Sequence, residues 1–223
     1  VLSLSNIVNE RTVIEALTNE VWPKVHTLEI RESLFNGTLL KILARSNAFP
    51  NLVSLDLSGN PFVDNDLETL ISNQDWRLRT LNLSECELKS TAVQTLVKSS
   101  FVDHLHTLTL FQNEFGAQGA SALAKSEHLT RLRRLDLRCN HLEARQYLAL
   151  TKGELLSRLT ELRLGCFRDT PPCTAAEGAE LMRALESPNI RHLDLTGIPI
   201  GARGAKAMAS KEWASRLRIL ELS

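Results

Sequence analysis

One leucine pattern recurs along nearly the whole chain, and it constrains the fold more than any other feature. The pattern LxxLxLxx(N/C)x(L/F) is almost unvaried in four copies: LVSLDLSGNPF from Leu52, LRTLNLSECEL from Leu78, LHTLTLFQNEF from Leu105 and LRRLDLRCNHL from Leu132. Self-similarity at a fixed period is typical of a solenoid, in which a repeat buries its apolar face only against its neighbours. We therefore expect a repeat array rather than a globular core.

The middle leucine of the pattern marks each repeat. Steps between successive markers are 26, 27, 26, 27, 27, 27, 31 and 27 residues. This spacing predicts nine strands and eight turns of solenoid in a single domain that spans residues 1–223. The markers are Leu2, Leu28, Leu55, Leu81, Leu108, Leu135, Leu162, Leu193 and Leu220.

The segments between the strands have a helical pattern. Most markers are followed by an apolar residue twelve and again fifteen positions later, such as Leu67 with Leu70, Ala120 with Leu123 and Ala205 with Met208. This spacing predicts an amphipathic helix of two to three turns. Both leucines of LxL point to one side of the strand and the residue between them points to the other. The sequence thus predicts an α/β horseshoe with a parallel concave sheet and short convex helices.

A polar slot lies where the chain leaves the strand. Asn60, Asn113 and Asn140 occupy it in three repeats, and Cys86 occupies it in a fourth. We expect the buried amides to satisfy backbone groups of their own turn and of the adjacent repeat. Ile7, Phe167 and Ile198 break the pattern, so we expect the loops to differ there.

Composition excludes several classes of protein. The 41 leucines among 223 residues are incompatible with disorder, and no apolar run approaches the length of a membrane span. The net charge is zero, with 26 bases and 26 acids, which argues against nucleic acid and acidic membrane as partners. The balance conceals an asymmetry, because residues 1–111 carry 13 acids and 9 bases whereas residues 112–223 carry 13 acids and 17 bases.

The four cysteines are Cys86, Cys139, Cys166 and Cys173, and they form no CxxC pair. They are too few for a disulfide-stapled scaffold, so we expect a reducing, cytoplasmic setting. The alternative is a bridge between Cys166 and Cys173 across the lengthened seventh repeat, GCFRDTPPCTAAEG. That insertion also offers Arg168 as a candidate contact for a partner, since longer loops on a solenoid often belong to its binding face.

The repeated motif resembles leucine-rich repeat proteins, and its helical returns look most like the ribonuclease-inhibitor-type branch. GAQGASALAKSEHLTRLRRLDL and GARGAKAMASKEWASRLRILEL are similar, more narrowly, to bacterial leucine-rich repeats. This resemblance implies a curved solenoid that binds proteins through its concave sheet, as inhibitors, effectors, receptor sensing domains and GTPase-activating proteins do. The chain starts and stops inside a strand motif with no polar cap, so we expect a monomeric fragment of a longer protein, with ends that contact flanking repeats.

Atypical residues on the concave face are the candidate partner-binding site. Equivalent positions of successive repeats form a column on the sheet. Phe111 places an aromatic ring in the column of serine, threonine, glycine and arginine that follows the second leucine of LxL, next to Arg138, and both types are enriched at binding hot spots. The ring either binds a partner or lies flat on its neighbours, and the residues leave both options open.

Charged residues of the same face form two groups. Glu29 with Asp56, and Asp194 with Glu221, are adjacent carboxylates that are either docking points for a basic partner or already neutralised by Arg31 and Arg163. Two cross-repeat ion pairs are expected to be structural: Asp136 with Arg163, and Arg134 with Glu161.

Catalytic motifs are missing from the sequence: it has no GxSxG, P-loop or HExxH, and His104 with His106 lacks a convincing third metal ligand. We therefore expect no enzyme activity, no metal and no cofactor. The predicted function is a scaffold or signalling module that binds a protein or peptide. The alternative is an accessory domain that positions Arg134, Arg138 or Arg163 at the active site of a partner or fused enzyme, for example a GTPase.

Overall fold

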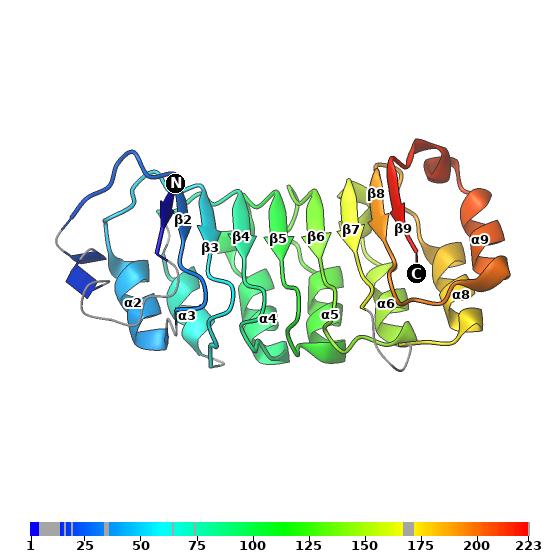
Figure 1. Ribbon diagram of the computed structural model, residues 1–223, viewed down its shortest axis with the longest axis horizontal. Coiled ribbons are helices and arrows are strands. Elements are labelled where there is room, and N and C mark those ends of the chain that lie inside the picture. The colour runs from blue at the N-terminus through cyan, green and yellow to red at the C-terminus, as the bar shows by residue number, and fades with distance from the viewer. Residues whose placement is uncertain are drawn as a thin grey trace.

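A computed structural model describes residues 1–4, 14–15, 17–18, 20–33, 36–63, 65–73, 75–166 and 172–222 of the chain. Nine parallel strands form one sheet in strict chain order, and they stand side by side in Figure 1. Each strand is only two or three residues long. They are β1 Leu2–Ser3, β2 Thr27–Glu29, β3 Ser54–Asp56, β4 Thr80–Asn82, β5 Thr107–Thr109, β6 Arg134–Asp136, β7 Glu161–Arg163, β8 His192–Asp194 and β9 Ile219–Glu221.

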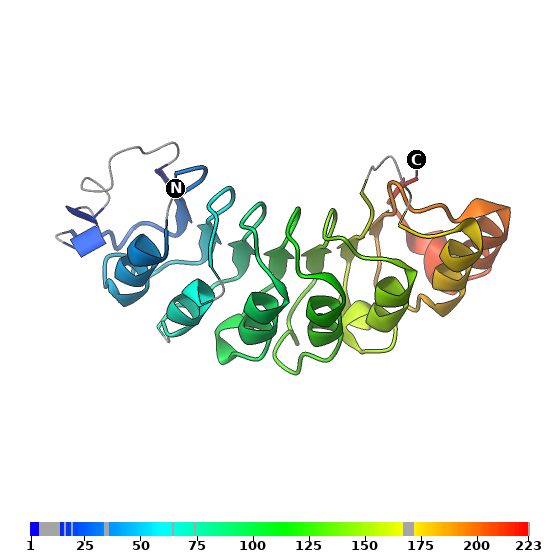
Figure 2. The ribbon, with the colours of Figure 1, turned by 90° about the horizontal axis from the view of Figure 1, so that it is seen from below.

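Helices form a second layer on one side of the sheet. Figure 2 shows the resulting arc, in which the helices lie on the outer side. This is the predicted α/β solenoid. The α-helices are α2 Gly37–Arg45, α3 Asp66–Ile71, α4 Ser90–Val97, α5 Gly116–Ala124, α6 Ala144–Leu150, α7 Leu155–Arg158, α8 Ala175–Ala184 and α9 Gly201–Ala209. Two 3₁₀ helices, η1 Ser100–Val102 and η2 Glu212–Arg216, lie between a helix and the next strand.

The strand register agrees with the marker spacing at every step. Leu2 pairs with Leu28, Leu28 with Leu55, and the same ladder continues to Leu193 with Leu220. Glu29 therefore lies beside Asp56, and Arg134 lies beside Glu161, as the columns predict. The insertion of the seventh repeat leaves this register unchanged, because Leu162 still pairs with Leu193.

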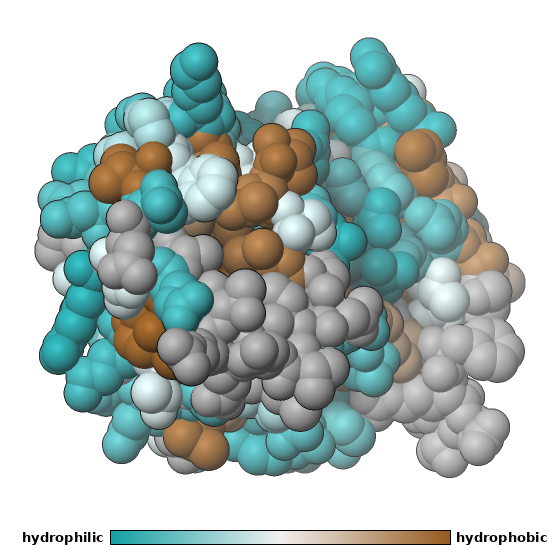
Figure 3. All heavy atoms as spheres, turned by 60° about the vertical axis from the view of Figure 1, so that its left-hand side comes forward, coloured by the Kyte–Doolittle hydropathy of each residue, from teal (hydrophilic) through white to brown (hydrophobic). Residues whose placement is uncertain are grey.

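Burial of each leucine depends on the next repeat. Leu193 and Leu195 of the β8 segment are fully buried, whereas the equivalent Leu220 and Leu222 are 39% and 45% exposed. The difference arises because apolar surface leaves water only where a neighbouring turn covers it. At the opposite end Val21 and other apolar side chains are exposed, and Figure 3 shows apolar atoms at the surface among mainly hydrophilic ones.

Helix packing follows the predicted spacing with one exception. Leu67 with Leu70 and Ala120 with Leu123 are buried, as expected. Ala205 is exposed, so the prediction that it faces the core was wrong. Gly204 takes the inward position with Met208, since a Cβ on Gly204 would lie only 2.8 Å from Cβ of Ile200. The inward face of α9 is thus formed by Gly204 and Met208, four residues apart. Among the described residues, no helix is long and apolar enough to cross a membrane.

Buried amides occupy the polar slot and satisfy backbone groups, as predicted. Asn113 donates from Nδ2 to the carbonyls of Leu83 at 2.8 Å and Leu110 at 3.1 Å. Its Oδ1 accepts from the backbone N–H groups of Cys86 at 3.1 Å and Leu88 at 2.9 Å, which belong to the previous repeat. Each such amide therefore joins two turns of the solenoid.

Two smaller side chains occupy the same slot in other repeats. Ser33, which the pattern search missed, is buried and donates from Oγ to the carbonyl of Leu4 at 3.1 Å. The Cys86 thiol lies 3.2 Å from the carbonyl of Leu57. Burial raises the pKa of Cys86 to about 12, so its thiol is not a reactive nucleophile.

The alternative bridge between Cys166 and Cys173 was wrong in its pairing. Cys139 is bonded to Cys166, 27 residues later, whereas Cys173 is free and half-buried. Cys139 and Cys166 both stand four residues after a marker, which places them on adjacent rungs of one column. The ladder that aligns the concave columns also brings these two sulfurs together.

Candidate functional site

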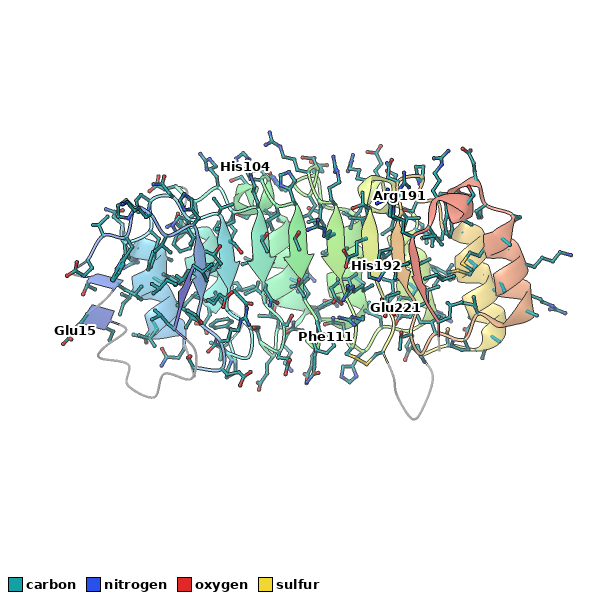
Figure 4. The ribbon with its side chains drawn as sticks, turned by 45° about the horizontal axis from the view of Figure 1, so that its top comes forward. Glu15, His104, Phe111, Arg191, His192 and Glu221 are labelled. Carbon is teal, nitrogen blue, oxygen red and sulfur yellow. A yellow bond between two sulfur atoms is a disulfide. The ribbon has the colours of Figure 1, made fainter. Side chains whose placement is uncertain are left out.

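The concave face has three zones that differ in chemistry. At its N-terminal end lies an ion-pair cluster around Arg31. Small polar residues follow on β4 and β5, namely Thr80, Asn82, Thr107 and Thr109. From β6 onward most of the strand residues that face the concave side are ionisable: Arg134, Asp136, Glu161, Arg163, His192, Asp194 and Glu221. Phe111 lies where the second zone meets the third, and Figure 4 labels it together with His192 and Glu221.

Three acids that stand between the two leucines of LxL have a structural role that the sequence did not predict. Asp56 accepts the backbone N–H of Ser58 at 3.0 Å, and Asp194 accepts that of Thr196 at 2.9 Å. Asp136 accepts the N–H of Arg138 at 3.1 Å in the same way. A short carboxylate two residues before the N–H closes this turn at the end of the strand. One oxygen of each carboxylate thus accepts a hydrogen bond from its own loop.

The acidic pair at the N-terminal end is neutralised within the chain. Arg31 Nε lies 2.9 Å from Asp56 Oδ2, and a terminal nitrogen of the same guanidinium lies 3.1 Å from Glu29 Oε1. One arginine therefore bridges both carboxylates. Of the two options that the sequence left open for Glu29 and Asp56, the geometry favours internal neutralisation over docking of a basic partner.

Arg138 is the hub of the C-terminal zone. Its Nε donates to Asp136 Oδ1 at 3.0 Å and its NH2 donates to Asp136 Oδ2 at 2.7 Å, a two-point contact. NH1 reaches Asp194 Oδ2 at 3.4 Å on β8, and the intervening rung of this column is Gly165, which has no side chain. Hydrogen bonding to Asp136 holds the pKa of Arg138 above its usual value. The Asp194 side chain is only 1% exposed, so this ion pair is largely shielded from water.

Phe111 is half-buried rather than freely exposed. The Arg138 guanidinium carbon lies 5.3 Å from the centre of its ring, within the range of a cation–π contact. The two residues that the sequence singled out are therefore in contact, and together they present an aromatic face with a charged edge.

The remaining charges pair differently from the prediction. Arg134 lies 3.8 Å from Glu161, so that predicted pair is confirmed. The predicted pair of Asp136 with Arg163 was wrong. Arg138 pairs with Asp136 instead, and Arg163 Nε lies 2.8 Å from Glu161 Oε1. That Nε makes no hydrogen bond of good geometry to any described residue, so the contact is an ion pair only.

The acids near β9 contact residues that the sequence did not assign to them. His192 lies between Glu161 and Glu221, with Nε2 2.6 Å from Glu221 Oε1 and Nδ1 3.6 Å from Glu161 Oε1. Arg138, and not Arg163, neutralises Asp194. The signal was available, since His192 is the residue before the eighth marker and stands directly beside Glu161 in its column.

Three arginines of this zone differ in the exposure of their side chains. The Arg134 side chain is 63% exposed, against 29% for Arg138 and 31% for Arg163. Arg134 is thus the arginine of this zone that is most open to a partner. Arg168 lies outside the described residues. Within the part of the chain that the structure describes, no three His, Cys, Asp or Glu side chains are grouped as metal ligands would be.

We predict unequal effects on stability for two arginines of this zone. Arg138→Ala removes the cation beside the buried Asp194 and is expected to lower the free energy of unfolding by about 1–3 kcal/mol. Arg134→Ala removes an exposed, long ion pair and should change it by less than about 1 kcal/mol. Urea unfolding followed by circular dichroism measures both. Equal effects would contradict the assignment of Arg138 as the hub.

Comparisons with known proteins address the family. Family models described as Leucine Rich Repeat match residues 51–73, 104–124 and 186–209. No curated protein sequence matches the chain. Among solved structures, the crystal structure of an internalin from Listeria monocytogenes superposes with a TM-score of 0.57 at 16% sequence identity. The match covers 100% of this chain and 62% of the internalin chain.

At this identity the likeness to the internalin concerns the fold alone. The family matches fall on repeats whose strands are in the predicted register. They do not distinguish the ribonuclease-inhibitor-type branch from others. The repeated motif, the single parallel sheet and the matched repeats show that this chain is built from leucine-rich repeats.

Proposed function

We propose that the chain is a protein-interaction module that binds its partner on the concave face, at the border between β5 and β6. The contact of Phe111 with Arg138 carries this proposal. It places an aromatic ring and a guanidinium just after β5 and β6, in the middle of the strand order, and the exposed Arg134 lies at the start of β6. Aromatic and arginine side chains contribute most of the binding energy at many protein interfaces.

The neighbouring rungs support this location. Ser58 and Ser84 precede Phe111 in its column, and Thr80 and Thr107 precede Arg134 in its own. These side chains are short, so a partner can approach the sheet here without meeting long side chains. Carboxylates such as Asp56 and Asp194 are less suitable anchors, because each is already bound to an arginine and to its own loop.

The test replaces Phe111 and Arg134 with the residue types that stand at the same position in the preceding repeats. Phe111→Ser with Arg134→Thr restores the ordinary column and leaves Arg138 with both aspartates, so the fold should be kept. We expect this variant to lose at least about tenfold in the amount of partner recovered by quantitative affinity capture, the size of effect that a hot spot produces.

A matched control changes similar side chains elsewhere. Val63→Ser with Arg203→Thr removes an exposed apolar residue and an exposed arginine that lie outside the concave face. This variant should recover the partner like the unaltered chain. Unchanged recovery with the concave variant, or an equal loss with the control, would refute the location of the site.

An accessory role toward an enzyme is the second candidate, and the contacts of the three arginines favour Arg134 for it. Arg138 and Arg163 are held by carboxylates at 2.7 Å and 2.8 Å, whereas Arg134 is held only at 3.8 Å. If the module positions an arginine at a partner's active site, Arg134→Ala should abolish stimulation while binding persists. Loss of binding alone would favour the interaction module.

A further inference from the structure

Basic residues line the edge of the sheet at which the strands begin. Two columns form this edge, and we call them the cationic rim: the residues four and two positions before each marker from Leu28 onward. They contain eight arginines, one lysine and three histidines but no acid. The first column is Lys24, Asn51, Arg77, His104, Arg131, Arg158, Asn189 and Arg216; the second is His26, Val53, Arg79, His106, Arg133, Thr160, Arg191 and Arg218.

Backbone hydrogen bonds hold the second column at a regular spacing. The N–H of His106 donates to the carbonyl of Arg79 at 2.8 Å, and the N–H of Arg133 donates to that of His106 at 2.9 Å. The same ladder joins Arg191 to Arg218 at 2.8 Å. Adjacent rungs of a sheet lie about 4.8 Å apart, so the backbone of the rim has a fixed spacing. Figure 4 shows His104 and Arg191 at the same edge of the sheet, opposite to Phe111.

Internal acids neutralise only part of this edge. Glu154 pairs with Arg158 and Glu212 pairs with Arg216, both in the first column. In the second column, Arg79, Arg133, Arg191 and Arg218 have no ion-pair partner among the described residues. Arg133 and Arg191 each donate from NH1 to the preceding carbonyl, at 2.9 Å and 2.8 Å, which leaves their other donors available.

The opposite edge of the sheet has the opposite charge. Positions four and six residues after the markers carry Glu32, Glu85, Glu87 and Glu114, and their described members include no lysine or arginine. Gln112, Glu85, Glu87 and Glu114 line a hollow of about 430 Å³ with His141. The net charge of zero therefore conceals a separation across the sheet, from a cationic rim to an acidic one.

We propose that the cationic rim binds an extended acidic segment of a partner protein. Arg79, Arg133 and Arg191 stand on every second rung, about 10 Å apart. Three residues of an extended polyproline II segment rise about 9 Å and make one full turn, so residues i and i+3 face the same side. A segment with a carboxylate at every third position can therefore place one carboxylate at each arginine. The planar guanidinium suits a carboxylate, because it offers two parallel donors to the two oxygens.

The charge distribution favours a narrow acidic segment over a broad polyanion. A nucleic acid or an anionic membrane carries negative charge over a wide surface, and it would also approach Glu161 and Glu221 on the sheet next to the rim. Like charges at such distances repel each other. A single extended chain can lie along the rim alone. This proposal concerns a surface separate from the Phe111 site and does not depend on it.

The test measures fluorescence anisotropy with a labelled twelve-residue peptide that has glutamate at every third position, and with a matched glutamine peptide. We expect the glutamate peptide alone to bind at 50 mM NaCl, and its affinity to fall several-fold at 200 mM because salt screens exposed charges. Arg79→Gln, Arg133→Gln and Arg191→Gln together should weaken binding about tenfold or more. The control, Arg145→Gln, Arg183→Gln and Arg203→Gln, has the same net charge but alters exposed helix residues, and it should change affinity less than about twofold.

Several outcomes would overturn the inference. These are no binding of the glutamate peptide at 50 mM NaCl, equal binding of the glutamine peptide, or equal losses in the two triple variants. A duplex oligonucleotide that binds the rim more tightly than the peptide would also overturn it and assign the rim to nucleic acid. The variant Phe111→Ser with Arg134→Thr should bind the acidic peptide normally, so failure of the concave site and failure of the rim are distinguishable.

Discussion

Replacing Asn113 with alanine is expected to lower the free energy of unfolding by about 3–5 kcal/mol, the largest effect of any single substitution considered for this chain. The amide makes five hydrogen bonds to backbone groups of two repeats: to Leu83, Leu110 and Phe111 as donor, and from Cys86 and Leu88 as acceptor. Alanine would leave these groups buried without this partner. The measurement is chemical unfolding followed by circular dichroism.

Asn189→Ala is the matched control for Asn113. Asn189 is an exposed asparagine that makes one hydrogen bond, from Nδ2 to the carbonyl of Ser157 at 2.9 Å. Because water can replace that bond, its loss should cost at most about 1 kcal/mol. Similar losses for the two variants would show that the buried slot does not join adjacent repeats in the way that the structure indicates.

Cleavage of the Cys139–Cys166 bond should have the second large effect. The bond closes a loop over a separation of 27 residues, and the loss of chain entropy in the unfolded state is expected to stabilise the fold by roughly 3–4 kcal/mol. Cys139→Ser should therefore lower the unfolding midpoint under oxidising conditions. A reductant should lower the midpoint of the unaltered chain in the same way and leave the variant unchanged.

Mass spectrometry identifies the bonded pair directly. Alkylation of the denatured, oxidised chain should modify Cys86 and Cys173 only, and prior reduction should make all four cysteines reactive. Denaturation is needed because Cys86 is buried with a pKa of about 12. A linked peptide that joins Cys166 to Cys173, or four reactive cysteines without reduction, would contradict the structure. Since stable disulfides are typical of oxidising compartments, the expected result would argue against the cytoplasmic setting that the cysteine count favours.

The repeat arithmetic predicted the backbone closely. Its markers are the residues that pair across every strand boundary, including the boundary with the insertion between Leu162 and Leu193. This success has a physical cause. In a solenoid each contact is made with the next copy of the same segment, so a fixed spacing in sequence becomes a fixed position in space. The same reasoning could have paired Cys139 with Cys166, which share a column.

Side-chain partners were predicted less well. The columns place Arg138 beside Gly165, but they do not show that its side chain extends past that glycine to Asp194, 56 residues later in the sequence. They also leave open whether Arg163 approaches Asp136 or Glu161. Long side chains have many rotamers, and which carboxylate they reach depends on the space that neighbouring side chains leave.

Sequence alone thus determined the class of fold, the number and register of the strands, the buried slot and the residues that face outward, because all of these follow from periodicity. The two charged rims are also visible in the sequence once the register is applied. Only the tertiary structure decided which of the outward-facing charges are already neutralised, and that Phe111 is partly covered by Arg138. Those outcomes depend on the distances between side chains of different repeats, which the curvature and packing of the solenoid set.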